Sequence, residues 1–172
     1  MKQYTNTIHI IFTVVGWGLL CISLLCFLFT WNSLPQKIGV HFDEKGNFDV
    51  ISDKENVFHA FYPYIISLIT LVFCEVFAFL SKRVKTGLKI NETGERKLRW
   101  VSMIFSDIIK VDVTIFFSGN WGYSLIRQQP LNIGITFCVF HVLLVSLLFM
   151  VVSIIFISVK YKTGRKLGEE VL

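Results

Sequence analysis

The stretch NIGITFCVFHVLLVSLLFMVVSIIFIS, residues 132–158, contains no Asp, Glu, Lys or Arg. At a rise of about 1.5 Å per residue, a helix of this length crosses the roughly 30 Å hydrocarbon core of a bilayer. Further runs of comparable length, rich in Leu, Ile, Val and Phe, cover residues 8–31, 60–81 and 101–124. We therefore expect four transmembrane helices.

The composition of the whole chain also indicates a membrane protein. Of its 172 residues, 53% are hydrophobic and only 17% are charged, whereas soluble domains average about 25% charged residues. The apolar runs are continuous, which is typical of helices that cross a membrane. The sequence thus predicts an all-α integral membrane protein, and its first partner is the lipid bilayer.

Lys and Arg residues are distributed unevenly over the connections between these runs. Residues 82–99 contain seven of them and residues 159–172 contain four, whereas residues 32–59 contain three Lys against five acidic residues. Because Lys and Arg near the ends of membrane spans favour the cytoplasmic side, we predict a multi-pass protein of the cell membrane with both termini in the cytoplasm. The net charge of +5 follows from this topology, so we expect no nucleic-acid partner.

The predicted organisation has four parts along the chain. Residues 1–81 contain helix one, an extracytoplasmic loop (32–59) and helix two; residues 82–99 form a basic cytoplasmic loop; residues 100–158 contain helices three and four; and residues 159–172 form a cytoplasmic tail.

The outer loop contains a short pattern typical of a β-hairpin. Apolar and other residues alternate over 37–42 and again over 48–50, as in a half-buried strand. The intervening DEKGN, residues 43–47, is typical of a turn in which Gly46 takes a positive φ. Because an isolated hairpin is marginally stable in water, we expect its apolar side to rest on the bilayer surface or on the outer ends of the helices.

The polar residues of this hairpin form a candidate recognition loop: His41, Asp43, Gly46, Asp49 and Lys54. Together with His59, the imidazoles and carboxylates are of the types that hold Zn²⁺, and they could bind a metal or an extracellular peptide. Alternatively, His41 and Asp49 connect the two strands by a hydrogen bond and Gly46 serves only the turn. No tight ligand spacing favours the metal, so we assign neither a metal nor a cofactor.

The same loop resembles the pattern Leu-Pro-x-x-Ile-Pro-x-His-Phe-x-x-x-Gly-x-x-Asp-x-x-x-x-Lys. That pattern marks a small membrane domain of unknown function, common in Firmicutes and found at the N-terminus of SdpI-type immunity proteins. Gly39 stands in place of the second proline. The resemblance implies a Gram-positive cytoplasmic membrane and immunity to, or sensing of, a toxin peptide. The matching residues are Leu34, Pro35, Ile38, His41, Phe42, Gly46, Asp49 and Lys54.

The run 101–124 differs from the other three because it contains Asp107, Lys110 and Asp112. An ionised group near the centre of a bilayer costs roughly 2.5–3.5 kcal/mol on insertion scales, so these residues need partners. Asp107 and Lys110 are three residues apart and can neutralise each other on one helix face, which Thr114 shares. Asp112 points away from that face.

We expect Glu75 and His141, from the second and fourth runs, to face the same stripe. The candidate intramembrane polar seam is therefore Glu75, Asp107, Lys110, Asp112, Thr114 and His141. One interpretation is that these contacts fix how the helices pair. The other is a proton- or ion-linked site, or a surface on which a partner docks.

The sequence contains no G-x-S-x-G, HExxH or Gly-rich phosphate loop, so we do not expect an enzyme. The main hypothesis is a binding or interaction module whose partner is a toxin peptide or another membrane protein. The alternative is a small transporter or channel-like subunit that uses the Asp107–Lys110 seam. It would act as a homo-oligomer, because four helices alone leave little room for a pathway.

Overall fold

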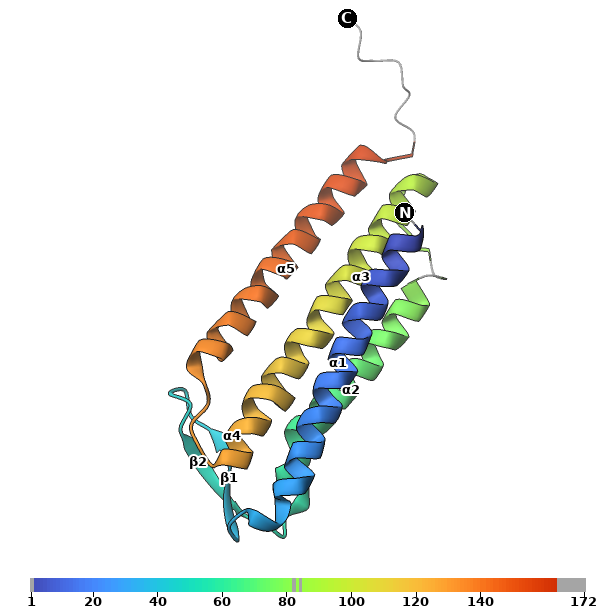
Figure 1. Cartoon of the computed structure of the whole chain (residues 1–172). Coiled ribbons are helices and arrows are strands. Elements are labelled where there is room, and N and C mark those ends of the chain that lie inside the picture. Colours follow the sequence, from blue (N-terminus) through green and yellow to red (C-terminus); the bar gives the residue numbers. More distant parts are fainter. Residues whose placement is uncertain (1, 82, 84, 164–172) are drawn as a thin grey trace, which may run out of the picture.

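The computed structural model describes residues 2–81, 83 and 85–163, with side chains from Thr7 onward within these ranges. Four long helices lie alongside one another and alternate in direction (Figure 1). A β-hairpin lies at one end of this bundle, and α1 begins and α5 ends at the other (Figure 1). The long helices are α1 (Lys2–Thr30), α2 (Val57–Ser81), α3 (Glu92–Thr114) and α5 (Ile133–Lys160). Lys82, Arg165 and Lys166, which contribute to the predicted charge bias, lie outside the described residues.

Three helical segments of the described chain are long and apolar enough to cross a membrane, namely Thr7–Ser33, Val57–Ser81 and Ile133–Lys160. Many of their large apolar side chains face outward, as Phe73 and Phe140 do, and such a surface suits contact with a lipid bilayer. For these three, the prediction of helices long and apolar enough to cross a membrane is confirmed. The helix expected over 101–124 exists, but its charged residues keep it from meeting the same criterion.

The helix that starts at Glu92 is longer than the predicted span. The Asn91 side chain caps its N-terminus by accepting a hydrogen bond from the Gly94 N–H. Helical backbone continues through a π-helical segment, η2 (Ile115–Trp121), into α4 (Gly122–Arg127). Gln128 then ends the helix in the left-handed region, with φ 50°.

The most polar of the long helices occupies the centre of the bundle. α3 packs against α1, α2 and α5, and α5 has η2 as its other main neighbour. The α3 residues Asp107, Lys110 and Thr114 are each at most 2% exposed. The charged residues of this helix explain its central position. The surrounding helices shield these charges from lipid and also supply their polar partners.

The predicted hairpin is present between α1 and α2. A short 3₁₀ turn, η1 (Trp31–Ser33), leads into β1 (Lys37–Phe42), which pairs antiparallel with β2 (Phe48–Asp53). The pairing is irregular: Val40 is an extra residue in β1 and Asp49 an extra residue in β2. Such bulges increase the local twist and redirect side chains.

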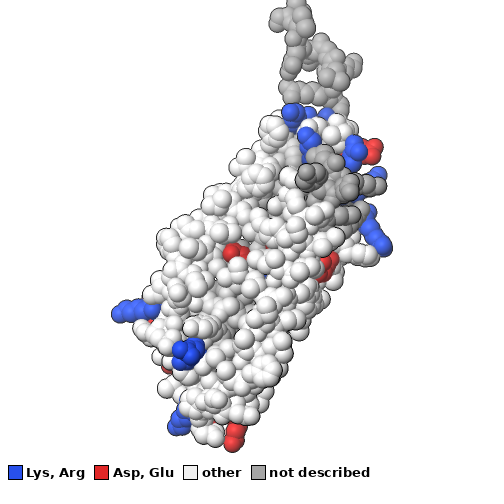
Figure 2. Space-filling model, in the orientation of Figure 1, with Lys and Arg blue, Asp and Glu red and all other residues white. Residues whose placement is uncertain are grey.

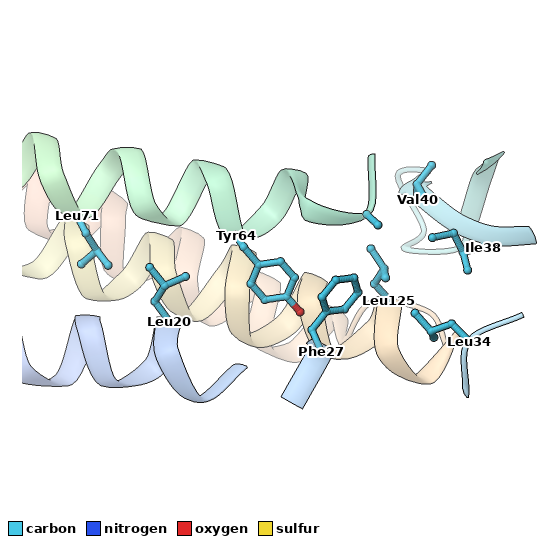
Figure 3. Packing of buried hydrophobic residues seen from close by; sticks show 9 residues of the cluster. Leu20, Phe27, Leu34, Ile38, Val40, Tyr64, Leu71 and Leu125 are labelled. Atoms are coloured by element: carbon cyan, nitrogen blue, oxygen red, sulfur yellow. The ribbon is translucent and has the colours of Figure 1, made fainter. Parts of the chain in front are cut away.

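The hairpin rests on the outer ends of the helices, one of the two positions expected for it. Ile38 and Val40 lie in one buried cluster with Phe27 of α1, Tyr64 of α2 and Leu125 of α4 (Figure 3). Burying an apolar side chain of this size contributes about 1.5–3 kcal/mol, which stabilises two strands that would be marginal alone. In β2, Phe48 is half-buried and Val50 is 46% exposed.

The opposite end of the bundle is closed by a second contact between distant segments. Ile90 pairs with Lys162 in an isolated β-bridge. On either side of it, the Asn91 N–H donates to the Tyr161 carbonyl at 2.8 Å, and the Thr163 N–H donates to the Lys89 carbonyl at 2.9 Å. The loop after α2 is therefore joined to the end of α5.

Candidate functional site

The centre of the bundle contains an ion-pair network around Lys110. Its side chain is fully buried. The Nζ atom lies 2.7 Å from Oε1 of Glu75, 2.9 Å from Oδ1 of Asp107 and 2.7 Å from Oγ1 of Thr13. The three donors of the ammonium group therefore have one acceptor each, from α1, α2 and α3.

His9 completes this network from α1. Its Nδ1 lies 2.8 Å from Oδ1 of Asp107, and its Nε2 lies 3.4 Å from Oε2 of Glu75. Thr13 donates a hydrogen bond of 2.8 Å to Oε1 of Glu75. We call His9, Thr13, Glu75, Asp107 and Lys110 the charge network.

The charge network contains two carboxylates, one ammonium group and one imidazole. With a neutral imidazole its formal charge is −1, and with a protonated imidazole it is zero. Buried ion pairs are tolerable only when their remaining polar atoms are also satisfied. Here Lys110 and His9 each contact both carboxylates. The arrangement can hold three helices together.

The sequence predicts only part of this network. The predicted pair of Asp107 with Lys110 is confirmed, and Glu75 joins it as expected. His9 and Thr13 were missed, because His9 lies at the margin of the first apolar run. The available signal was their spacing of four residues, which places both on one helix face.

The other seam residues have different environments. Thr114 donates to the backbone carbonyl of Lys110 at 2.7 Å. Asp112 is 6% exposed, and its Oδ2 has no hydrogen-bond partner among the described residues. The expectation for His141 is wrong: it is exposed, with its Nδ1 2.8 Å from the Phe137 carbonyl on its own helix. The buried residues of α5 are Val139, Ser146 and Ile157.

Polar contacts continue along the central helix from the charge network toward the hairpin. Ser118 in η2 donates to Ser67 of α2 at 2.7 Å, and both are fully buried. Asn120 donates to Oγ1 of Thr136 at 3.0 Å and joins η2 to α5. These contacts satisfy the buried polar side chains of η2, the segment that departs from α-helical hydrogen bonding.

At the outer end, His41 and Asp49 connect the two strands. The His41 Nδ1 lies 2.6 Å from Oδ1 of Asp49, while their side chains are 57% and 41% exposed. Asp43 serves the turn, because its Oδ1 accepts from the N–H groups of Lys45 and Asn47 at 2.9 and 2.8 Å. Gly46 takes the predicted positive φ, +79°.

The remaining candidates of the recognition loop do not converge on this pair. Lys54 donates to the Leu34 carbonyl at 3.1 Å, with its Nζ 5.3 Å from the centre of the Trp31 ring. His59 lies 3.1 Å from the Ser52 hydroxyl. Within the described part of the chain, no three His, Cys, Asp or Glu side chains form a group suited to a metal ion.

Backbone hydrogen bonds fix the hairpin to the bundle. The Gly39 N–H donates to Oε1 of Gln128 at 2.8 Å, and the Leu131 N–H donates to the Gly46 carbonyl at 2.8 Å. A proline at position 39 could not make the first bond. In addition, the Phe48 ring lies directly over Gly39, where any β-carbon would collide with it. The packing of this hairpin therefore requires glycine at position 39.

The two strands differ in how their edges are covered. β1 lies beside α4, and the Gly39 N–H of β1 donates to the side chain of Gln128, the residue that follows α4. β2 pairs only with β1 among the described residues, so its second edge is unpaired. On this edge strand Val50 and Ile51 are 46% and 67% exposed. Exposed edge strands present unpaired N–H and C=O groups that can pair with another chain.

No family model, curated protein or solved structure gave a match to this chain.

Proposed function

We propose that the protein is a small multi-pass membrane protein that binds an extended peptide along the outer edge of β2. The unpaired edge of this strand carries the proposal. A peptide that adds a third strand would gain main-chain hydrogen bonds from it, and side-chain contacts would give specificity. Val50 and Ile51 would supply apolar contact, and the exposed His41–Asp49 pair would supply polar contact.

The contacts that fix the hairpin to the helix bundle support this role. Gly39 and Leu131 donate backbone hydrogen bonds across the contact between hairpin and bundle, and Ile38 is fully buried beneath it. A receptor strand held in place before binding loses little conformational entropy when a peptide docks. The edge is therefore preorganised.

In the proposed topology, the central helix crosses the membrane as a fourth span, shielded by α1, α2 and α5. Lys and Arg side chains gather at the end of the bundle opposite the hairpin, and the middle is almost free of them (Figure 2). By the positive-inside rule, that end lies on the cytoplasmic side of the cell membrane, and β2 lies on the extracytoplasmic side. The family resemblance adds immunity to a toxin peptide as the biological consequence of binding.

A selected peptide tests the proposal. A displayed library of random peptides would be panned on the protein in phosphatidylcholine nanodiscs, and amide hydrogen exchange would locate each selected peptide. We expect slower exchange in residues 48–53. Ile51→Lys should weaken binding about tenfold or more, since a charge on the edge strand opposes strand addition.

Val57→Lys is the matched control, because Val57 is 50% exposed at the start of α2, beyond the strand. It should leave peptide binding unchanged. Peptides that protect other segments but not 48–53, or equal loss in both variants, would contradict binding at this edge.

The charge network supports a second candidate function, a transport or channel-like subunit. The supporting observation is that four ionisable groups from three helices meet, and that the Glu75 side chain at their edge is 30% exposed. Ionisable groups inside a membrane commonly mark proton or ion pathways. The pathway would form between copies of the chain.

Proton flux into proteoliposomes tests this second candidate. Wild-type protein should dissipate a proton gradient faster than Glu75→Gln, and a pH-sensitive dye inside the vesicles reports both rates. Cross-linking in the same vesicles measures the oligomer that this function requires. Equal rates for wild type, Glu75→Gln and empty vesicles would reject transport by the charge network.

A further inference from the structure

A groove lies at the end of the bundle opposite the hairpin, between the loop after α2 and the end of α5. Its volume is about 720 Å³. It is open on one side, and its lining combines an apolar floor with two cationic side chains. The lining residues are Leu88, Lys89, Ile90, Ser158, Val159, Lys162 and Thr163.

The walls of this groove are held together by tertiary contacts. The bridge between Ile90 and Lys162, with the hydrogen bond from the Thr163 N–H to the Lys89 carbonyl, joins segments about 70 residues apart. Both lysines are exposed. Among the described residues, neither Lys89 nor Lys162 forms an ion pair, so both ammonium groups are available to a ligand.

A neighbouring lysine, Lys97, is bound to Tyr161 and does not line the groove. Lys97 donates to the Tyr161 hydroxyl at 2.6 Å, and its Nζ lies 4.9 Å from the centre of the same ring. The hydrogen bond from Lys97 lowers the pKa of the Tyr161 hydroxyl. This contact anchors Tyr161, whose carbonyl accepts from the N–H of Asn91, next to the groove residue Ile90.

The position of the groove relative to the apolar surface limits what can occupy it. α5 ends at Lys160, and just before that end Ile155, Phe156 and Val159 are about 60% exposed, at 59%, 59% and 60%. The groove therefore begins where a membrane-spanning surface ends, at the height of lipid headgroups. Val159 belongs to both surfaces.

We propose that this groove binds an anionic phospholipid, with its phosphate between Lys89 and Lys162 and an acyl chain along the exposed face of α5. The charge of the two lysines is complementary to the phosphate, and the apolar lining residues Leu88, Ile90 and Val159 are complementary to the upper acyl chain. Basic pockets beside membrane helices favour such headgroups. The proposal is independent of peptide binding at β2.

Lipid retention in detergent tests this proposal. Purified protein would be mixed with phosphatidylglycerol or phosphatidylcholine, and native mass spectrometry would measure the fraction that keeps a lipid. We expect wild type to retain phosphatidylglycerol preferentially. Lys89→Gln with Lys162→Gln should weaken its apparent affinity roughly 30-fold, because each lysine near an anionic lipid contributes about fivefold.

Lys37→Gln with Lys45→Gln is the matched control, since it removes the same charge from exposed residues of the hairpin. It should retain phosphatidylglycerol like wild type. Equal retention by both double variants would overturn the proposal. A thermal melt without added lipid shows whether each variant is folded, and charge reversal by Lys89→Glu should abolish retention even if the glutamine variant is ambiguous.

Free glycerol 3-phosphate distinguishes a lipid from a soluble phosphate. A lipid site needs the acyl contact, so millimolar glycerol 3-phosphate should neither displace phosphatidylglycerol nor bind in its absence. Displacement by glycerol 3-phosphate would assign the groove to a soluble phosphate compound and would overturn the lipid proposal.

Discussion

The ammonium nitrogen of Lys110 lies 2.7 Å from a carboxylate oxygen of Glu75, across the interface between α3 and α2. The residues are 35 positions apart in the sequence, and the Lys110 side chain is fully buried. This contact turns the local Asp107–Lys110 pair into a link between helices, because Glu75 in turn contacts Thr13 and His9 of α1.

Removing the central cation should therefore destabilise the bundle. Lys110→Met leaves the buried Asp107 and the partly exposed Glu75 without their ammonium partner, and breaking a buried pair costs about 3–5 kcal/mol. Adding Asp107→Asn to Lys110→Met should recover part of that loss. Thermal unfolding in detergent measures both, with Lys45→Met at an exposed turn position as control. Strictly additive losses in the double variant would contradict the pairing.

Asp112 should respond in the opposite way from Asp107. Its buried Oδ2 lacks a partner among the described residues, and an unpaired carboxylate in an apolar environment is costly. Asp112→Asn should leave the melting temperature unchanged or raise it, whereas Asp107→Asn alone should lower it. Parallel melts of the two variants decide the matter, and a larger loss for Asp112→Asn would show that Asp112 has an essential partner.

Gly39→Pro should destabilise the hairpin, although the resembling family has proline at this place. The substitution removes the N–H that donates to Gln128 and places a ring against Phe48. A lost hydrogen bond alone contributes about 0.5–1.5 kcal/mol, so Gln128→Ala should cost less than Gly39→Pro. Amide exchange in residues 37–53 would measure the loss. Unchanged exchange in Gly39→Pro would mean that the hairpin reaches the bundle differently.

Gly46→Val and the double variant His41→Ala with Asp49→Ala should separate folding from recognition. Valine cannot readily take a φ of +79°, and its side chain would meet Leu131. Membrane abundance should fall for Gly46→Val. The exposed His41–Asp49 pair is worth roughly 0–1 kcal/mol, so its removal should preserve abundance but weaken peptide binding. An immunoblot of membranes showing equal loss for both would make the pair a structural element.

The proposed orientation can be tested with single cysteines in a variant that lacks the four native ones. Cysteine at the exposed turn residue Asn47 should react with a membrane-impermeant thiol reagent in intact cells. Cysteine at Lys85, in the basic loop, should react only after permeabilisation. The reverse labelling pattern would place the hairpin in the cytoplasm.

The sequence by itself determined the features that depend on neighbouring residues. Continuous apolar runs predicted the membrane helices, because the rise of a helix fixes the length that spans a bilayer. The alternating strand pattern and Gly46 predicted the hairpin and its turn. The spacing of three residues predicted the Asp107–Lys110 pair, since a helix brings such positions together.

Only the tertiary structure decided which distant side chains meet. Helix rotation and depth place His9 and Glu75 beside Lys110 and leave His141 facing outward, and neither quantity can be read from hydropathy. α3 became the central helix because its charges are shielded and satisfied only when apolar helices surround it. The contact of Gly39 with Gln128, and the groove between Lys89 and Lys162, likewise depend on packing between segments far apart in the chain.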